Sequence, residues 1–189
     1  MTGPNAAHRR LVGLLRAQSI VTGDLRLKSG KPTSWFIDAK QTLCRSDGLL
    51  AVAELALDVI PPYAAAVGGL TVGADPVAYG VAAVAATRGR DLRSFTVRKE
   101  TKGHGAGGRI AGALLPGDKV VITEDVVTRG SSPLEAARVV RDHGADVVMI
   151  LAVVDRGGVC ADRAAAEGIG FCALVTAPDL GFGYELAGA

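Results

Sequence analysis

From about residue 45 to its end, the chain alternates short apolar runs with segments of helical length. This alternation is typical of β-α-β units, in which each strand of a parallel sheet is followed by a covering helix. The runs are apolar at nearly every position, as strands buried on both faces are. We therefore predict an α/β fold, an open parallel sheet flanked by helices, with strands near 64–67, 92–97, 119–123, 147–154 and 171–175 and helices near 47–59, 76–87, 133–143 and 161–167.

The helix near 133–143 carries the clearest end signals. Ser132 is a candidate N-cap, Pro133 suits the first helical position and Glu135 completes a capping box. Gly144 stands where a left-handed C-cap belongs. These signals place the start of the helix directly after a polar loop.

The first 40 or so residues follow another pattern, a helix over about 5–18 and then a short hairpin with Ser29 and Gly30 at its turn. A chain of 189 residues suits one domain, and neither a repeat nor a linker supports a split. We predict a single domain in which residues 1–42 form an N-terminal helix and a small hood, and residues 43–189 form the α/β core.

Charge and cysteine content exclude several classes of protein. Lysine and arginine number 21 against 19 acidic residues, and this net charge of +2 is too balanced to coat nucleic acid. Cys44, Cys160 and Cys172 form no CxxC pair, which argues against a disulfide framework or a zinc site and favours the cytoplasm. Arg16 interrupts the apolar N-terminal run, and no stretch reaches the roughly 20 apolar residues of a membrane span, so we expect neither a signal peptide nor a transmembrane helix.

The most informative segment, residues 119–140, joins an apolar strand, an acidic pair, a Thr/Gly/Ser loop and a helix. Ligands of open parallel sheets bind beyond the carboxyl ends of the strands, where this loop must lie. Backbone N–H groups at the helix start suit a phosphate monoester, although the two serines could instead serve only as caps. The carboxylates of Glu124 and Asp125 would repel a bare anion, so a phosphorylated sugar with magnesium explains both features.

The sequence VVITEDVVTRGSS at 120–132 resembles the motif with which type I phosphoribosyltransferases bind 5-phosphoribosyl 1-pyrophosphate (PRPP). The resemblance implies that Glu124 and Asp125 hold the ribose hydroxyls. Arg129 stands where a small residue is more usual, and its guanidinium either adds a phosphate contact or points to solvent. The residues implied for the 5′-phosphate are Thr128, Arg129, Gly130, Ser131 and Ser132.

A second segment, VRKETKGHGAGGRIAG at 97–112, sets cations among glycines directly after a strand, which predicts a mobile basic loop. Taken alone it suits a solvated surface loop, and nucleic-acid binding is disfavoured because aromatic residues are missing from it. The pattern Arg-Lys-x-x-Lys-x-His-Gly resembles the catalytic loop of orotate phosphoribosyltransferases, which closes over the neighbouring subunit's active site. The resemblance implies a homodimer, with Lys102 and His104 reaching the pyrophosphate and Arg98 and Lys99 contacting phosphates.

A third segment, residues 66–80, predicts a strand, a Gly/Thr loop and a helix opened by Asp75 and Pro76. It is either an ordinary turn capped by Asp75 or a second anion site. The resemblance to orotate phosphoribosyltransferases implies that Thr71, Gly73 and Asp75 line the pyrophosphate. Those enzymes often have a lysine here and this chain has none, so we expect backbone contacts, with charge supplied by the basic loop and magnesium.

The segment LKSGKPTSWFID at 27–38 is a basic turn followed by Trp35 and Phe36. By composition it is a hairpin whose aromatic side chains fill a small core. It resembles the N-terminal hood of orotate phosphoribosyltransferases. The resemblance implies that Lys28 contacts the substrates and that Phe36 lies against the pyrimidine.

Arg156 follows Asp155 at the end of the strand near 147–154. The two side chains either form a surface ion pair, or the guanidinium captures a carboxylate through two parallel hydrogen bonds. The resemblance implies that Arg156 binds orotate. Thr128 is the further residue that we assign to the orotate site.

These resemblances predict an enzyme, a glycosyltransferase that converts orotate and PRPP to orotidine 5′-monophosphate and pyrophosphate in de novo pyrimidine synthesis. Lys102, His104 and Asp125 are the candidate catalytic residues. Magnesium is expected mainly through the substrate, with Asp125 as the candidate protein ligand, and neither nucleic acid nor membrane is expected as a partner. The alternatives are transfer to another nucleobase, against which the hood and Arg156 argue, and a non-catalytic PRPP-sensing regulator, against which the intact basic loop argues.

Overall fold

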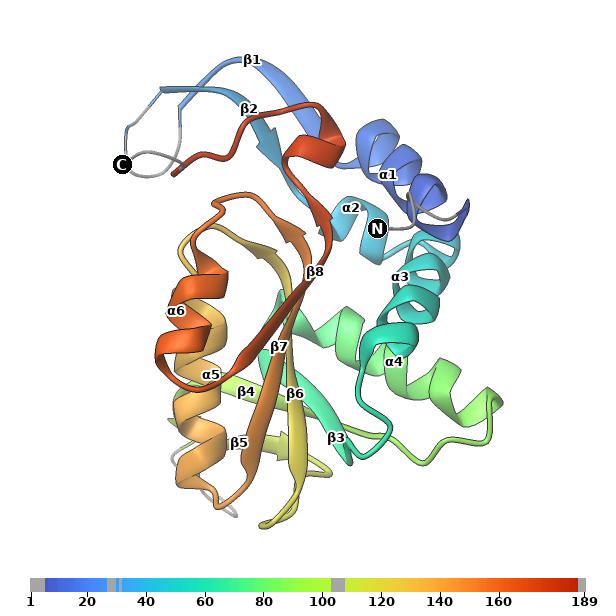
Figure 1. The fold of residues 1–189 in the computed structure, drawn as a ribbon, viewed down its shortest axis with the longest axis vertical. Helices are drawn as coiled ribbons and strands as arrows, with labels where there is room; N and C mark the ends of the chain where they lie inside the picture. Colours follow the sequence, from blue (N-terminus) through green and yellow to red (C-terminus); the bar gives the residue numbers. More distant parts are fainter. Residues whose placement is uncertain (1–5, 27–29, 31, 103–107, 187–189) are drawn as a thin grey trace.

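A computed structural model describes residues 6–26, 30, 32–102 and 108–186. The strands of the main sheet are β3 (Ala66–Leu70), β4 (Arg93–Lys102), β5 (Gly108–Gly112), β6 (Lys119–Val127), β7 (Asp146–Asp155) and β8 (Gly170–Thr176). The helices that cover it are α3 (Ser46–Val59), α4 (Ala74–Thr87), α5 (Ser131–Asp142) and α6 (Cys160–Ala166). Figure 1 shows α3 and α4 on one side of the sheet and α5 and α6 on the other, which confirms the predicted α/β fold.

The strands of the sheet run in the order β5-β4-β3-β6-β7-β8. All neighbours are parallel except β5, which pairs antiparallel with β4. The prediction of a loop over the whole of 97–112 is therefore wrong at both ends of that range, where β4 continues to Lys102 and β5 begins at Gly108. The chain folds back into a hairpin in which Val97 pairs with Ile110. Arg109 stabilises this hairpin, because its Nε donates a hydrogen bond to the Arg98 carbonyl at 2.7 Å and its Nη2 pairs with the carboxylate of Glu135 on α5.

Two apolar layers enclose the sheet, one on each face. Val121 of β6 belongs to the layer under α3 and α4, and its neighbours Val120 and Ile122 belong to the layer under α5. This alternation follows from the two-residue repeat of a strand, which sends successive side chains to opposite faces. Because both faces are covered, the strands are apolar throughout, as the sequence indicated.

The N-terminal segment forms α1 (Ala6–Gln18), the two-stranded antiparallel hood of β1 (Ile20–Arg26) and β2 (Pro32–Ile37), and the short helix α2 (Lys40–Leu43). The helix and hairpin were predicted, whereas α2 was not. Leu11 and Leu15 of α1 are fully buried in the same apolar layer as α3. Nowhere in the described ranges does a helix have the length and apolar character needed to cross a bilayer.

The C-terminal segment leaves β8, forms a short 3-10 helix, η1 (Pro178–Leu180), and returns alongside the hood (Figure 1). Arg16 of α1 donates a hydrogen bond to the carbonyl of Asp179, with Nη2 3.2 Å from the oxygen. This hydrogen bond joins α1, near the start of the described chain, to η1, near its end.

Candidate active site

The strand order reverses between β3 and β6. From β3 the chain continues through α4 to β4 on one side, and from β6 through α5 to β7 on the other. In open α/β sheets such a reversal leaves a crevice beyond the carboxyl ends of the two strands, and ligands bind there. The predicted pyrophosphate loop follows β3 and the acidic pair ends β6, so both lie at this crevice.

The acidic pair is buried against the loop that follows β3. Glu124 is 5% exposed and Asp125 is 7% exposed. A Cβ atom on Gly73 would lie 2.5 Å from Asp125 Oδ1 and 2.6 Å from Glu124 Oε1, closer than such atoms approach. Only a residue without a side chain fits between the loop and the carboxylates, so these two sequence-predicted segments form one site.

Lys40, which the sequence analysis missed, is the charged partner of this pair. Its Nζ lies 2.8 Å from Asp125 Oδ2 and 3.2 Å from Asp38 Oδ1. Burial alone would lower the pKa of Lys40, but the hydrogen bond and charge of Asp125, helped by Asp38, outweigh it and raise that pKa. Lys40 and Asp125 are 85 residues apart, and no local pattern in the sequence connects them.

Burial shifts the protonation of Glu124. Burial, followed by the nearby charge of Asp125, raises the pKa of Glu124 to about 9. Its Oε1 accepts a hydrogen bond from the Asp125 amide at 3.2 Å, and its buried Oε2 has no partner among the described residues. Burial and the neighbouring carboxylate therefore favour the protonated form of Glu124, which can donate a hydrogen bond.

The predicted phosphate loop joins β6 to α5. This helix begins at Ser131, and Gly130 precedes it with a φ of 73°. The predicted capping box is wrong, because Glu135 pairs with Arg109 and no side chain caps the helix start. Gly144 has a φ of 90° after the end of α5, as expected of a left-handed C-cap.

The surroundings of the phosphate loop leave its helix start open. Ser131 and Ser132 are exposed, and so is Arg129, whose carbonyl accepts a hydrogen bond from Arg163. Gly130 packs against Cys160, since a Cβ atom on Gly130 would lie 2.5 Å from the Sγ atom of that cysteine. The first-turn N–H groups of α5 are thus available to an anion at the surface of the crevice.

Asp75 holds the loop after β3 in shape. Helix α4 begins at Ala74, one residue before Asp75, so the prediction of Asp75 as a cap before a helix 76–87 is wrong. Its carboxylate instead accepts hydrogen bonds from the hydroxyls of Thr71, at 2.6 Å, and Thr96, at 2.8 Å. The hydroxyl of Tyr79 in turn lies 2.6 Å from that of Thr96.

The basic segment contributes the hairpin of β4 and β5. Arg98 is half-buried and Lys99 is exposed on β4, and Lys102 is the last residue of that strand. His104 lies outside the described residues, as does Lys28 of the hood. The structure thus places the base of the predicted catalytic segment on the edge of the sheet.

Arg156 is a further buried charged residue near the crevice. Its amide donates to the Val127 carbonyl at 2.8 Å, which places it next to Thr128 at the carboxyl end of the neighbouring strand. The predicted alternative of a surface pair with Asp155 is wrong, because that carboxylate accepts hydrogen bonds from the amides of Gly157 and Gly158. A carboxylate used in this way shapes the turn and leaves the arginine free for other contacts.

The two hood aromatics have different environments beside Arg156. The guanidinium carbon lies 5.1 Å from the ring centre of Trp35 and 5.8 Å from that of Phe36. Trp35 is buried and stacks on Phe182 with ring centres 4.3 Å apart, whereas Phe36 is 41% exposed. Trp35 therefore fills the core, and Phe36 offers a free aromatic face next to a cation.

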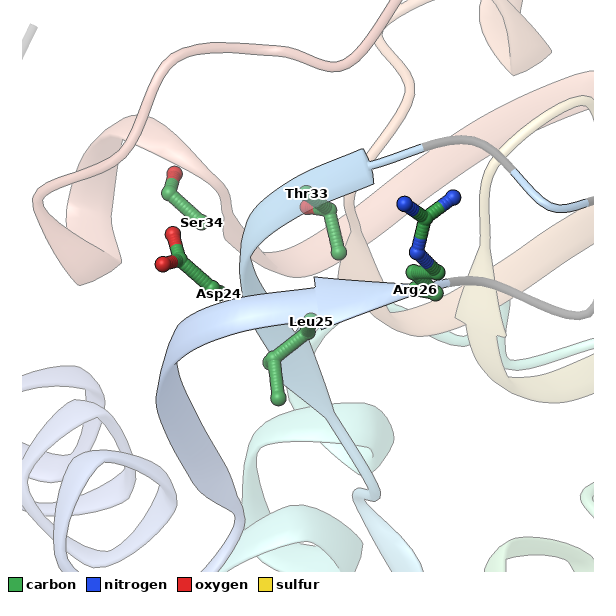
Figure 2. A pocket seen from close by; sticks show the side chains of 5 residues that line it. All are labelled: Asp24, Leu25, Arg26, Thr33 and Ser34. Atoms are coloured by element: carbon green, nitrogen blue, oxygen red, sulfur yellow. The ribbon is translucent and has the colours of Figure 1, made fainter.

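A separate pocket of about 480 Å³ lies in the hood itself. Figure 2 shows its lining side chains, which come from the two hood strands and include Asp24 and Ser34 on one side and Arg26 on the other. None of the residues that line it belongs to the acidic pair, the phosphate loop or the Arg156 cluster. Among the described residues, moreover, no three His, Cys, Asp or Glu side chains gather where they could hold a metal ion.

Comparison with known proteins identifies the family. No family model matches the chain. It is 36% identical to the orotate phosphoribosyltransferase of Rhodopirellula baltica over 90% of this chain and 92% of that protein. It is 39% identical to the enzyme of that name from a Nostoc species over 95% and 88% of the two chains. The chain belongs to the orotate phosphoribosyltransferases.

Solved structures of orotate phosphoribosyltransferases share the fold. The Mycobacterium tuberculosis enzyme in complex with PRPP superposes with a TM-score of 0.78 at 31% identity, covering 93% of this chain and 99% of that one. These likenesses confirm the predicted family, fold and enzyme class. They favour the orotate enzyme over transfer to another base and over a non-catalytic regulator.

Proposed function

We propose that the chain transfers the 5-phosphoribosyl group from PRPP to orotate, in the crevice between β3 and β6. The bond from C1′ to the pyrophosphate oxygen breaks and its electrons leave with pyrophosphate, while orotate N1 forms the new bond to C1′ and releases its proton to water. The observation that carries this proposal is the contact of the pyrophosphate loop with the acidic pair at Gly73, since it brings two PRPP-binding segments into one site. The solved complex of the Mycobacterium tuberculosis relative with PRPP supports the same substrate.

For PRPP, we assign the ribose hydroxyls to Glu124 and Asp125. Glu124, whose raised pKa favours its protonated form, can donate to one hydroxyl oxygen and the carboxylate of Asp125 can accept from the other, so the pair suits a diol. The exposed helix start supports a 5′-phosphate on the backbone of the phosphate loop. The proposed pyrophosphate contacts come from Thr71, Gly73 and Asp75 after β3 and from Arg98, Lys99, Lys102 and His104 of the basic segment.

For orotate, we assign the carboxylate to Arg156 and the ring to Phe36. A guanidinium binds a carboxylate through two parallel N–H bonds, and an exposed aromatic face suits a flat pyrimidine. The close backbone contact between the two strand ends supports Thr128 as a further neighbour of the base. Lys28 completes the proposed set from the hood.

Catalysis on this proposal is mostly positioning and electrostatics. Orotate is already an anion, so the site must stabilise a positive ribose and the growing charge of pyrophosphate. Asp125 faces the ribose, and Lys102 and His104 would meet the leaving group. Carboxylate oxygens are the donors that magnesium prefers; bound through PRPP, the ion would supply positive charge to the pyrophosphate, with Asp125 as its proposed protein ligand.

We further propose that the enzyme works as a homodimer in the cytoplasm, on the pathway of pyrimidine synthesis. Cys44, Cys160 and Cys172 are free thiols, which supports a reducing setting. The hairpin of β4 and β5 lies at the edge of the sheet, a position that a neighbouring subunit can contact. In that arrangement Lys102 of one chain would serve the acidic pair of the other.

One assay tests the activity and one tests the subunit arrangement. The purified protein should consume orotate only when PRPP and magnesium are both present; preference for adenine or uracil would refute the base assignment. Lys102→Ala and Asp125→Asn should each be nearly inactive, and mixing them should restore about half the activity per mixed dimer, because one of its two sites is intact. Demonstrated subunit exchange without recovered activity would mean that each chain completes its own site.

A further inference from the structure

Glu185 lies in the segment that follows η1 and has no role in the function proposed above. This segment is attached to the strand end that holds Arg156. The Glu185 amide donates to the Arg156 carbonyl at 3.0 Å, and the Leu186 amide donates to the Gly157 carbonyl at 3.3 Å. The Tyr184 ring lies directly against Gly158, where a Cβ atom would be 2.7 Å from it. Glu185 is therefore held in a fixed place beside the arginine.

The same segment is also attached to the hood. Phe182 stacks on Trp35 with an angle of 5° between the rings, and the Trp35 carbonyl accepts a hydrogen bond from Arg156 Nη2 at 3.3 Å. Figure 1 shows this C-terminal segment running next to the two strands of the hood. Arg156 thus lies where the β7 end, the hood and the C-terminal segment meet.

Within this cluster, each edge of the guanidinium has a different neighbour. Glu185 Oε2 lies 3.3 Å from Nε, within ion-pair distance, and the buried Nε makes no hydrogen bond to any of the described residues. Nη2 points to the Trp35 carbonyl, so the Nε edge and one side of Nη2 are occupied. A carboxylate that binds through two parallel bonds can then use the end of the guanidinium, between Nη1 and Nη2.

We propose that Glu185 is a positioning residue for orotate recognition, which holds the Nε edge of Arg156 so that its two Nη atoms face the orotate carboxylate. This inference rests on the proposed role of Arg156 in binding orotate. The Glu185 charge also balances a buried guanidinium that would otherwise be unpaired before the substrate arrives. Without Glu185 the arginine can turn its Nε edge outward, and the carboxylate meets a cation of variable orientation.

Steady-state kinetics of Glu185→Ala and Glu185→Gln test this role. We expect the orotate KM of Glu185→Ala to rise about tenfold, the effect of losing one ion pair that orients a charged group, with the PRPP KM and kcat nearly unchanged. Glu185→Gln keeps the shape of the side chain and should show a smaller rise in the same constant. Glu167→Ala is the matched control, because Glu167 also forms ion pairs with arginines, Arg138 and Arg141, which precede it by 29 and 26 residues. Its side chain is 23% exposed, against 25% for that of Glu185.

The Arg156→Lys background separates this inference from the proposed function. If Glu185 acts through the guanidinium, Glu185→Ala should change the orotate KM little once Arg156 is lysine. An unchanged or lower orotate KM in both folded Glu185 variants would overturn the positioning role, and so would equal rises for orotate and PRPP or the same rise in Glu167→Ala. If Arg156→Lys itself leaves the orotate KM unchanged, the assignment of Arg156 to the base is what fails.

Discussion

Replacing Gly130 with alanine tests how the phosphate loop is built. The φ of 73° at this residue costs an alanine about 1–2 kcal/mol, because its Cβ then crowds the following carbonyl. In addition, the new Cβ would lie 2.5 Å from the Sγ atom of Cys160, which is fully buried, and such overpacking costs about 1–3 kcal/mol. Gly130→Ala should therefore lower the free energy of unfolding by about 2–5 kcal/mol.

The chain contains a control that carries only the first of these two costs. Gly89, after the end of α4, has a φ of 69°, and a Cβ atom on it would meet nothing within 4 Å. Gly89→Ala should cost about 1–2 kcal/mol. Urea unfolding of both variants measures the difference, which is the cost of the Cys160 contact.

A double-mutant cycle identifies the atom responsible. Cys160→Ala removes the sulfur, so Gly130→Ala should cost about 1–3 kcal/mol less in that background than in the native one. The PRPP KM should rise in Gly130→Ala, because the helix start shifts, and should recover in part in the double variant, where the strain of the positive φ remains. If Gly130→Ala costs no more than Gly89→Ala, or if Cys160→Ala brings no relief, the packing argument is wrong.

Two further predictions concern the acidic pair. Lys40→Met should lower the free energy of unfolding by about 1 kcal/mol, because Asp125 loses a partly exposed ion-pair partner, and the loss should be smaller in 1 M salt. Urea unfolding at two salt concentrations measures this loss. Lys40→Arg is the control, and its free energy of unfolding should stay close to that of the wild type. Glu124 has a pKa of about 9 when folded and 4.5 as its ordinary value, so the folded state binds the extra proton and its stability should fall as pH rises from about 5 to 9. Glu124→Gln should remove that slope in unfolding experiments at several pH values, and an unchanged slope would contradict the assigned protonation.

The parts of the fold that the sequence predicted are those set by local patterns. The strand, acidic pair, polar loop and helix around 119–140 are consecutive, so hydrophobic periodicity and turn residues were enough to identify them. Helix boundaries were less certain, because a capping signal competes with tertiary contacts. Glu135 shows this: three residues from Ser132 it suits a capping box, yet in the fold it is the partner of Arg109.

The contacts that complete the candidate site could not be predicted, because they join distant segments. Lys40 reaches Asp125 across 85 residues, and Glu185 comes from a segment that the predicted strands and helices did not include. Neither residue belongs to a motif, and the sequence predicted a role for neither. Pairing of this kind is decided by which loops meet at the carboxyl edge of the sheet, and one sequence does not contain that information in a local pattern.

Both charged halves of the candidate site are balanced within the chain. Asp125 faces Lys40, and Arg156 faces Glu185. A substrate group that binds either residue must share it with this internal partner, so the gain in binding energy is smaller than for an unpaired charge. What the internal partners provide instead is geometry, because Lys40 holds Oδ2 of Asp125 and Glu185 lies at the Nε edge of Arg156. On the proposed function, recognition of orotate and PRPP thus depends more on the orientation of these two residues than on the strength of their charges.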